Sequence, residues 1–215
     1  MIGGENLIFN EKIAKNYDRW YESKKGKHYD GLEKNLMWKL IKPAYGESLL
    51  DIDCGTGHHL KWFRSWGLKV TGVDNSPYML QVARGNLGQD VELGLVDAEN
   101  LPFRPEQFDI VCMITTLEFL DDPKLSIKEA LSVCKNRVFL GVLNRYSAMS
   151  LKRRVKGMMF SDPIWKYAKF FSVRELVRLI KGLDEDLKVH WETTIPNSNG
   201  RNPFGAFIGL LIKKV

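Results

Sequence analysis

Residues 49–57 read Leu-Leu-Asp-Ile-Asp-Cys-Gly-Thr-Gly, and this stretch constrains the fold more than any other part of the chain. An apolar strand ends at the carboxylate Asp51, a short loop with Gly55 and Gly57 follows, and a helix-compatible run begins at His58. Glycine lets a backbone approach a ligand closely, and a helix N-terminus faces whatever lies above the strand. The pattern therefore predicts a loop that holds a nucleoside-type molecule at the carboxyl end of a parallel strand.

The loop departs at one glycine from each of two nucleoside-binding fingerprints. The dinucleotide pattern Gly-x-Gly-x-x-Gly fails because Leu60 occupies the position of its third glycine. The alternative pattern, an acidic strand residue followed by Gly-x-Gly-x-Gly, fails because Asp53 stands in place of its first glycine. The loop alone leaves both cofactor classes open, so the segments that follow it must decide between them.

A second predicted strand covers residues 69–74 and ends at Asp74. A carboxylate at this place can accept hydrogen bonds from both ribose hydroxyls of an adenosine. Ser76 and Pro77 then open a helix, because Ser is a favoured N-cap and Pro suits the first turn. We therefore expect Asp74 to bind a ribose rather than to cap the helix.

Two further predicted strands end in polar residues at the same edge of the sheet. The strand at 91–96 is followed by Asp97 and Ala98, and the strand at 108–114 is followed by Thr115. Ligands of open α/β sheets bind outside the carboxyl ends of the strands. These residues are therefore candidates for contacts with the same nucleoside, although Asp97 could also form a simple turn.

This set of motifs resembles the class I S-adenosylmethionine-dependent methyltransferases, in particular the UbiE-like, type 11 group. The resemblance covers most of the chain, from the motif at 9–20 to the apolar strand that begins at Phe207. It implies a Rossmann-like, seven-stranded, mostly parallel sheet with helices on both faces and an antiparallel last strand. It also implies S-adenosylmethionine as the cofactor, which leaves as S-adenosylhomocysteine.

The resemblance also assigns roles to residues of this chain. In that family the glycine loop lies under the methionine part of the cofactor, and the residue that matches Asp74 holds the ribose. The pair that matches Asp97 and Ala98 lies beside the adenine, and the residue that matches Thr115 lies near the sulfonium. Tyr17 either packs as core or closes over the sulfonium through a cation–π contact. The predicted cofactor-binding residues are Tyr17, Asp51, Asp53, Gly55, Gly57, Asp74, Asn75, Met79, Asp97, Ala98 and Thr115.

Methyl transfer from a sulfonium is an in-line displacement, so no catalytic dyad has to be visible in the sequence. The cofactor supplies the reactive methyl group, and a general base is needed only if the acceptor must lose a proton. Glu118, one turn beyond Thr115, is the candidate for such a base, with a structural or solvent-facing carboxylate as the alternative. His58 and His59 are interpreted as neutral polar residues of a first helical turn, and no metal site is predicted.

Composition is consistent with one cytoplasmic enzyme domain. A chain of 215 residues suits a single α/β domain with a buried core, and Cys54, Cys112 and Cys134 form neither a metal spacing nor a disulfide framework. The polar N-terminus predicts no signal peptide, and no apolar run is long enough to span a bilayer. We expect N-terminal helices over the cofactor site (1–45), a cofactor-binding core (46–143), a basic cap insertion (144–171), and a closing helix with two strands (172–215). The oligomeric state stays open.

The outer parts of the chain also carry element signals. Residues 10–42 predict two helices that are broken at 24–27. Ser172 and Glu175 form a capping box that opens a helix, which stops near Gly182. Two closing strands are expected at 187–195 and 204–215, separated by the turn-rich stretch 196–203.

The segment 145–169 holds seven basic residues and one acid, an excess equal to the net charge of +6 of the whole chain. Within it, an apolar stripe on a basic amphipathic helix is formed by Leu151, Val155, Met158 and Met159. The segment could attract an anionic small substrate, RNA phosphates, or an anionic membrane surface. In the simplest alternative it is a solvated helix whose apolar stripe packs on the domain.

Four function classes remain. The favoured one is a methyltransferase that acts on a small-molecule or lipid-like acceptor. An RNA methyltransferase could use the basic cap at 145–169, but the chain lacks an appended RNA-binding module and an Asn-Pro-Pro-Tyr-type motif. A non-catalytic S-adenosylmethionine-binding protein is kept open by Asp53, and a nicotinamide oxidoreductase is disfavoured by Leu60 and by Asp97-Ala98.

Asp53 poses the sharpest question. Asp tolerates a left-handed backbone better than most residues, so the loop can survive without its first glycine. Its carboxylate would repel the carboxylate of the cofactor but attract its ammonium or sulfonium. Asp53 therefore either hydrogen-bonds the methionine ammonium, or weakens affinity by distorting the loop.

Overall fold

A seven-stranded sheet forms the centre of the protein, as a computed structural model shows for residues 8–160, 163–194 and 202–214. The strands are β1 (Ser48–Ile52), β2 (Lys69–Asp74), β3 (Glu92–Leu95), β4 (Phe108–Ile114), β5 (Cys134–Leu143), β6 (Lys188–Thr193) and β7 (Phe207–Lys213). They lie in the order β3-β2-β1-β4-β5-β7-β6, and β7 runs antiparallel to both of its neighbours, β5 and β6. The predicted Rossmann-like sheet with an antiparallel last strand is confirmed.

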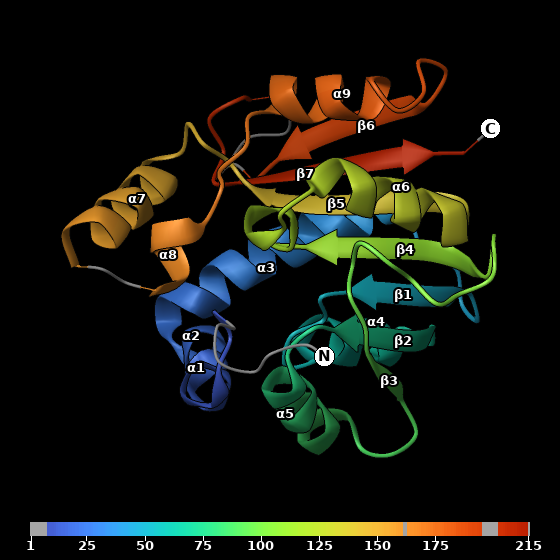
Figure 1. Cartoon of the computed structure of the whole chain (residues 1–215), viewed down its shortest axis with the longest axis horizontal. Coiled ribbons are helices and arrows are strands. Elements are labelled where there is room, and N and C mark those ends of the chain that lie inside the picture. Colours follow the sequence, from blue (N-terminus) through green and yellow to red (C-terminus); the bar gives the residue numbers. More distant parts are fainter. Residues whose placement is uncertain (1–7, 161–162, 195–201, 215) are drawn as a thin grey trace.

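Helices cover both faces of this sheet (Figure 1). The helices are α1 (Glu11–Tyr17), α2 (Arg19–Glu22), α3 (Lys24–Ile41), α4 (His58–Ser65), α5 (Pro77–Leu87), α6 (Pro123–Val133), α7 (Ala148–Phe160), α8 (Pro163–Tyr167) and α9 (Val173–Lys181), with a 3-10 turn at Leu117–Phe119. Side chains of α3, α4 and α5 pack on one face of the sheet, and those of α6 and α9 pack on the other. The central strands are buried on both faces, which explains why their sequences are continuous apolar runs.

Several helix starts follow the predicted capping chemistry. The Ser76 hydroxyl accepts a hydrogen bond from the Met79 backbone N–H, and Pro77 occupies the first turn of α5. Ser172 and Glu175 form the predicted capping box of α9, which ends at Gly182. These signals depend on residues three apart in the chain, so the sequence alone was enough to predict them.

The predicted break at 24–27 is wrong. The N-terminal helices instead break at Asp18 and Ser23, and α3 begins at Lys24 and runs through the predicted break. Gly26 lies inside α3, where a Cβ would lie 1.7 Å from the carbonyl oxygen of Trp20. The glycine therefore permits close packing of α2 on α3 and does not end a helix.

Three predicted strands are shorter than expected. The strand expected at 91–96 covers only Glu92–Leu95, and the closing strands are β6 and β7 within the wider ranges predicted for them. Residues 195–201 and Val215, which complete those ranges and the turn-rich stretch, lie outside the described residues. Strand ends depend on where pairing partners stop, and single-sequence patterns do not show this.

The described residues contain no helix that is both long and apolar enough to cross a membrane. Cys54, Cys112 and Cys134 are buried and free, as their spacing predicted.

Candidate functional site

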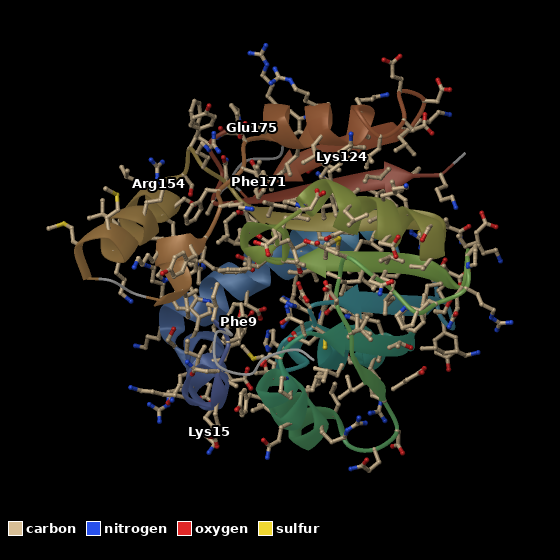
Figure 2. The ribbon with its side chains drawn as sticks, viewed as in Figure 1. Phe9, Lys15, Lys124, Arg154, Phe171 and Glu175 are labelled. Atoms are coloured by element: carbon tan, nitrogen blue, oxygen red, sulfur yellow. The ribbon has the colours of Figure 1, made fainter. Side chains whose placement is uncertain are left out.

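Two adjoining cavities lie at the carboxyl ends of the parallel strands, on the side where the ribbons of α1, α2, α7 and α8 gather (Figure 1). The inner cavity has a volume of about 310 Å³ and lies against the strand ends. The outer cavity, of about 980 Å³, extends between the N-terminal helices and α7–α8. Both are lined by Phe9, Tyr17, Thr115 and Phe119, so these four residues mark where the cavities meet. Figure 2 shows Phe9 between α1–α2 and the sheet.

The inner cavity brings together most of the predicted cofactor residues. Those that line it are Tyr17, Asp53, Gly55, Asp74, Asn75, Met79 and Thr115. Asp51, Gly57, Asp97 and Ala98 do not line it. Its other lining residues were not predicted, and they are Ile8, Phe9, Ile114, Phe119, Leu120 and Asp121.

The loop after β1 adopts left-handed backbone at three positions. Asp53, Gly55 and Gly57 have φ values of +56°, +56° and +78°. Asp53 therefore adopts the conformation that its side chain was expected to tolerate. A Cβ on Gly57 would lie 2.6 Å from Leu87 Cδ1, so this glycine serves the packing of the loop on α5.

Asp74 ties the loop to α5. Its Oδ2 accepts a hydrogen bond from the Gly55 N–H and its Oδ1 accepts one from the Ser76 N–H, both at 2.8 Å. Burial raises the pKa of Asp74 to about 6, although both hydrogen bonds favour the ionised form. Each carboxylate oxygen has a second lone pair, so Asp74 can still accept hydrogen bonds from a ligand in the cavity.

Two further carboxyl groups lie buried beside Asp74 with unsatisfied oxygens. Among the described residues neither oxygen of Asp51, which is 1% exposed, has a hydrogen-bond partner, and the same holds for Asp53 Oδ1. Burial, and then the charge of Asp74, raise the pKa of Asp51 to about 8 and that of Asp53 well above its usual range. A buried carboxyl oxygen without a partner is costly, so Asp53, which lines the cavity, favours a cationic, hydrogen-bond-donating ligand there.

Thr115 has a φ of +58°, which is an outlier for a β-branched residue. Its N–H donates to the Gly141 carbonyl at 2.7 Å, and the neighbouring Thr116 hydroxyl donates to the Ile52 carbonyl at 3.1 Å. These bonds to β5 and β1 hold the strained backbone in place. Strain of this kind is concentrated at functional sites, and here it lies where the two cavities meet.

Asp97 and Ala98 line neither cavity. Asp97 is exposed, and its carboxylate accepts a hydrogen bond from the Glu99 N–H at 2.9 Å, which is a turn contact. Ala98 is buried in the core. The structure therefore shows the turn that was considered for Asp97, and it leaves an adenine contact untested.

Glu118 is completely buried and does not line either cavity. Its Oε1 accepts a hydrogen bond from the Leu143 N–H, while Oε2 has no partner among the described residues. Burial raises the pKa of Glu118 to about 7. The carboxyl thus connects the 3-10 turn to the end of β5, close behind the outer cavity that Leu143 lines.

His58 and His59 are the first two residues of α4, and they lie beside Asp30 of α3. One possible metal-ligand atom from each of the three side chains lies within 4.8 Å of the other two. The Lys34 ammonium lies 2.7 Å from Asp30 Oδ2 and 2.9 Å from His58 Nε2. Burial lowers the pKa of His59 to about 3, so this imidazole is neutral, as expected. Because an ammonium already contacts two of the three ligand groups, the cluster is a poor site for a metal cation.

The basic segment folds into α7 and α8, but its apolar stripe does not pack on the domain. Met158 and Met159 are 83% and 73% exposed, and Leu151 and Val155 are exposed as well. The simplest alternative for this segment is therefore wrong. Helix α7 also lines the outer cavity with Lys152, Arg153 and Lys156. The sequence predicted that this segment is basic, but not that these three side chains line a cavity.

The fold is one that known methyltransferases share. A family model described as a methyltransferase domain matches residues 50–141, which run from β1 into β5. Together with the relatives described next, this match supports a class I S-adenosylmethionine-dependent methyltransferase, with S-adenosylmethionine as its cofactor.

Among its relatives, an uncharacterized protein of Methanocaldococcus jannaschii is 29% identical over 175 residues, covering 80% of this chain and 78% of that protein. A ubiquinone biosynthesis O-methyltransferase of Thiobacillus denitrificans is 32% identical over 150 residues, covering 65% of this chain and 64% of that protein. The match thus spans less than two thirds of that enzyme's length. A solved methyltransferase of Thermotoga maritima, described as a possible histamine N-methyltransferase, is 25% identical with a TM-score of 0.71, covering 97% of this chain and 98% of that one.

Proposed function

We propose that the protein transfers a methyl group from S-adenosylmethionine to a small-molecule or lipid-like acceptor in the outer cavity. The observation that carries this proposal is the junction of the two cavities at Tyr17, Thr115 and Phe119. A cofactor in the inner cavity and an acceptor in the outer cavity would meet there. The outer volume of about 980 Å³ is of the size that suits small-molecule ligands.

The residues of the inner cavity fit the cofactor chemically. We propose that Asp74 binds the ribose hydroxyls, that the loop from Asp53 to Gly57 holds the methionine part, and that Asn75 and Met79 flank the nucleoside. Asp53 lines the cavity and its Oδ1 has no partner among the described residues, so it can accept a hydrogen bond from the ammonium of this ligand, whose positive charge would favour the ionised carboxylate. Asp97 and Ala98 complete the proposed set on the adenine side. When bound, the cofactor supplies a methyl group on a positively charged sulfur.

The work of the protein is then to position the acceptor and to exclude water. Phe9, Tyr17 and Phe119 form an aromatic wall that lines both cavities where they meet, and the Phe9 and Phe119 rings pack edge to face at 5.0 Å. Holding two reactants in line in a dry site can lower a large part of the activation free energy of the reaction. An acceptor that must lose a proton would need a base, and Glu118 stays the candidate predicted from the sequence, though it would act from behind the cavity wall.

The relatives support a small or lipid-like acceptor, since they include enzymes named for ubiquinone biosynthesis and for demethylmenaquinone. An aromatic-walled cavity of this kind also fits a small molecule better than a duplex or a folded RNA. We also propose that the protein is cytoplasmic and that the chain forms a single domain with the four segments predicted from the sequence.

Transfer of a labelled methyl group to fractions of a cell extract tests the proposal. We expect label from S-adenosylmethionine in the small-molecule or lipid fraction. Label in RNA alone would overturn the proposed acceptor class. Binding of S-adenosylhomocysteine with no label in any fraction would favour the non-catalytic alternative.

The substitution Asp53→Gly should change stability and cofactor affinity in opposite directions. Glycine removes about 1 kcal/mol of left-handed strain, which should raise the Tm of the free protein by about 2–4 °C. It also removes the carboxylate that we propose contacts the methionine ammonium, so affinity for S-adenosylhomocysteine should fall about tenfold. Thermal unfolding and calorimetry measure the two effects.

Lys42→Gly is the matched control, because Lys42 is an exposed residue with a φ of +48° at the end of α3, far from both cavities. It should raise the Tm without changing affinity. Tighter cofactor binding by Asp53→Gly would instead mean that Asp53 distorts the loop.

A further inference from the structure

The charge of the outer cavity is strongly unbalanced. Its wall carries one acidic residue, Glu33, against five basic ones among the described residues: Lys12, Lys25, Lys152, Arg153 and Lys156. The remaining wall is largely aromatic and aliphatic, with Trp20, Tyr21 and Trp165 among its larger side chains. Such a cavity attracts an anion with an apolar body and repels a cationic amine.

Arg153 is the basic residue that is most firmly built into this wall. Its guanidinium carbon lies 4.5 Å from the centre of the Trp165 ring, so the cation stacks on an aromatic face. Its Nη1 is buried and has no hydrogen-bond partner among the described residues. Burial lowers the pKa of the guanidinium, but an Arg side chain stays charged in proteins. A buried guanidinium nitrogen without an acceptor is costly, which points to a ligand that supplies one.

The acidic groups nearby are poor counterions for Arg153. Burial raises the pKa of Glu33 to about 8 and that of Glu118 to about 7, although Arg153 acts to lower both. Glu33 is therefore a weaker counterion than a carboxyl group with an ordinary pKa. The positive charge of Arg153 remains available to an anion that enters the cavity.

We propose that the methyl acceptor is a molecule with a flat apolar body and a carboxylate group. Arg153 anchors this carboxylate group, and the apolar body lies among the aromatic side chains. This inference rests on the proposed function, because it places the acceptor in the outer cavity. A planar guanidinium can bind a carboxylate through two parallel N–H bonds, which fixes orientation as well as charge. The anchor on α7 and the aromatic wall at Phe119 would together hold the reacting atom near Thr115.

Binding of 2-naphthoate and of its neutral amide, 2-naphthamide, tests the anchor. Both are titrated by calorimetry into the full chain saturated with S-adenosylhomocysteine. We expect the carboxylate to bind at least tenfold more tightly than the amide, since a hydrogen bond to a charged group contributes about 1.5–3 kcal/mol. Arg153→Met should abolish this preference, and Arg153→Lys should keep part of it.

Arg154→Met is the matched control, because Arg154 is the next residue of α7 but lines a separate surface hollow and not the outer cavity. Figure 2 shows Arg154 on the side of α7 that faces away from α1 and α2. This variant should keep the preference for the carboxylate. Equal binding of the two probes to the unmodified protein, binding of neither, or a preserved preference in Arg153→Met would each overturn the inference.

The failure of the proposed function has a different signature. If the unmodified protein does not bind S-adenosylhomocysteine, the methyltransferase site itself is in error. If it binds S-adenosylhomocysteine but shows no preference between the probes, only the acceptor class is in error. Thermal unfolding and S-adenosylhomocysteine affinity of Arg153→Met, both expected to match the unmodified protein, exclude misfolding as the cause of a lost preference.

Discussion

Replacing Asp74 with alanine should lower the affinity for S-adenosylhomocysteine by about 100-fold or more. The reason is that two hydrogen bonds from ribose hydroxyls to a buried carboxylate would be lost, each contributing about 1.5–3 kcal/mol. The loss of the bonds from the Gly55 and Ser76 N–H groups would also release the loop from α5. Calorimetric titration of both proteins measures the difference.

Two companion variants separate binding from folding. Asp74→Asn keeps the size of the side chain and one acceptor oxygen, so it should lose less affinity than Asp74→Ala. Asp97→Ala removes an exposed carboxylate at the next strand end, and its effect should be several times smaller. An Asp74→Ala protein that unfolds normally and binds within threefold of the original would contradict the role proposed for Asp74.

The free energy of unfolding of the ligand-free protein should fall as the pH rises from 6.5 to 8. Burial raises the pKa of Asp51 from 3.8 to about 8 and that of Glu118 from 4.5 to about 7. The stability that these two carboxyls contribute is fully present below their pKa values in the unfolded state. It is lost as the pH rises through their pKa values in the folded state, because only the folded state resists ionisation. Each group contributes a slope of roughly 1.4 kcal/mol per pH unit while it is protonated only in the folded state.

Chemical denaturation at several pH values measures this slope. Asp51→Asn and Glu118→Gln remove one titrating group each, so each should flatten the curve. Working above pH 6.5 avoids the region where His59, whose pKa burial lowers from 6.5 to about 3, would oppose the trend, and it also avoids the titration of carboxyls with lowered pKa values, such as Asp30 and Asp109. A free energy of unfolding that stays level or rises over this range would show that these carboxyls are ionised in the folded protein.

The part of the site that the sequence could predict is the part made by local chain chemistry. Asp74 and Thr115 follow strands whose apolar runs define their ends, and parallel strands bring their carboxyl ends to one edge. The left-handed conformation of Asp53 follows from the place of this residue in a glycine loop. These positions needed no knowledge of tertiary packing.

The rest depended on how distant helices pack. Glu33 and Arg153 come from α3 and α7 and meet only across the outer cavity, so nothing in their own segments marks them as neighbours. The role of Gly26 depends on packing in the same way, because its contact with Trp20 is set by how α2 packs on α3. The apolar stripe of α7 has the periodicity of a packed helix, and periodicity alone does not show whether a partner surface exists.

Titration of the unmodified protein with S-adenosylhomocysteine, with NAD as the comparison, tests the central claim most directly. The inner cavity, its buried carboxyls and the family match predict one saturable site per chain for S-adenosylhomocysteine and no binding of NAD at the same concentrations. Binding of NAD in preference, or no heat with S-adenosylhomocysteine, would contradict the assignment of this loop to a methyl-donor cofactor.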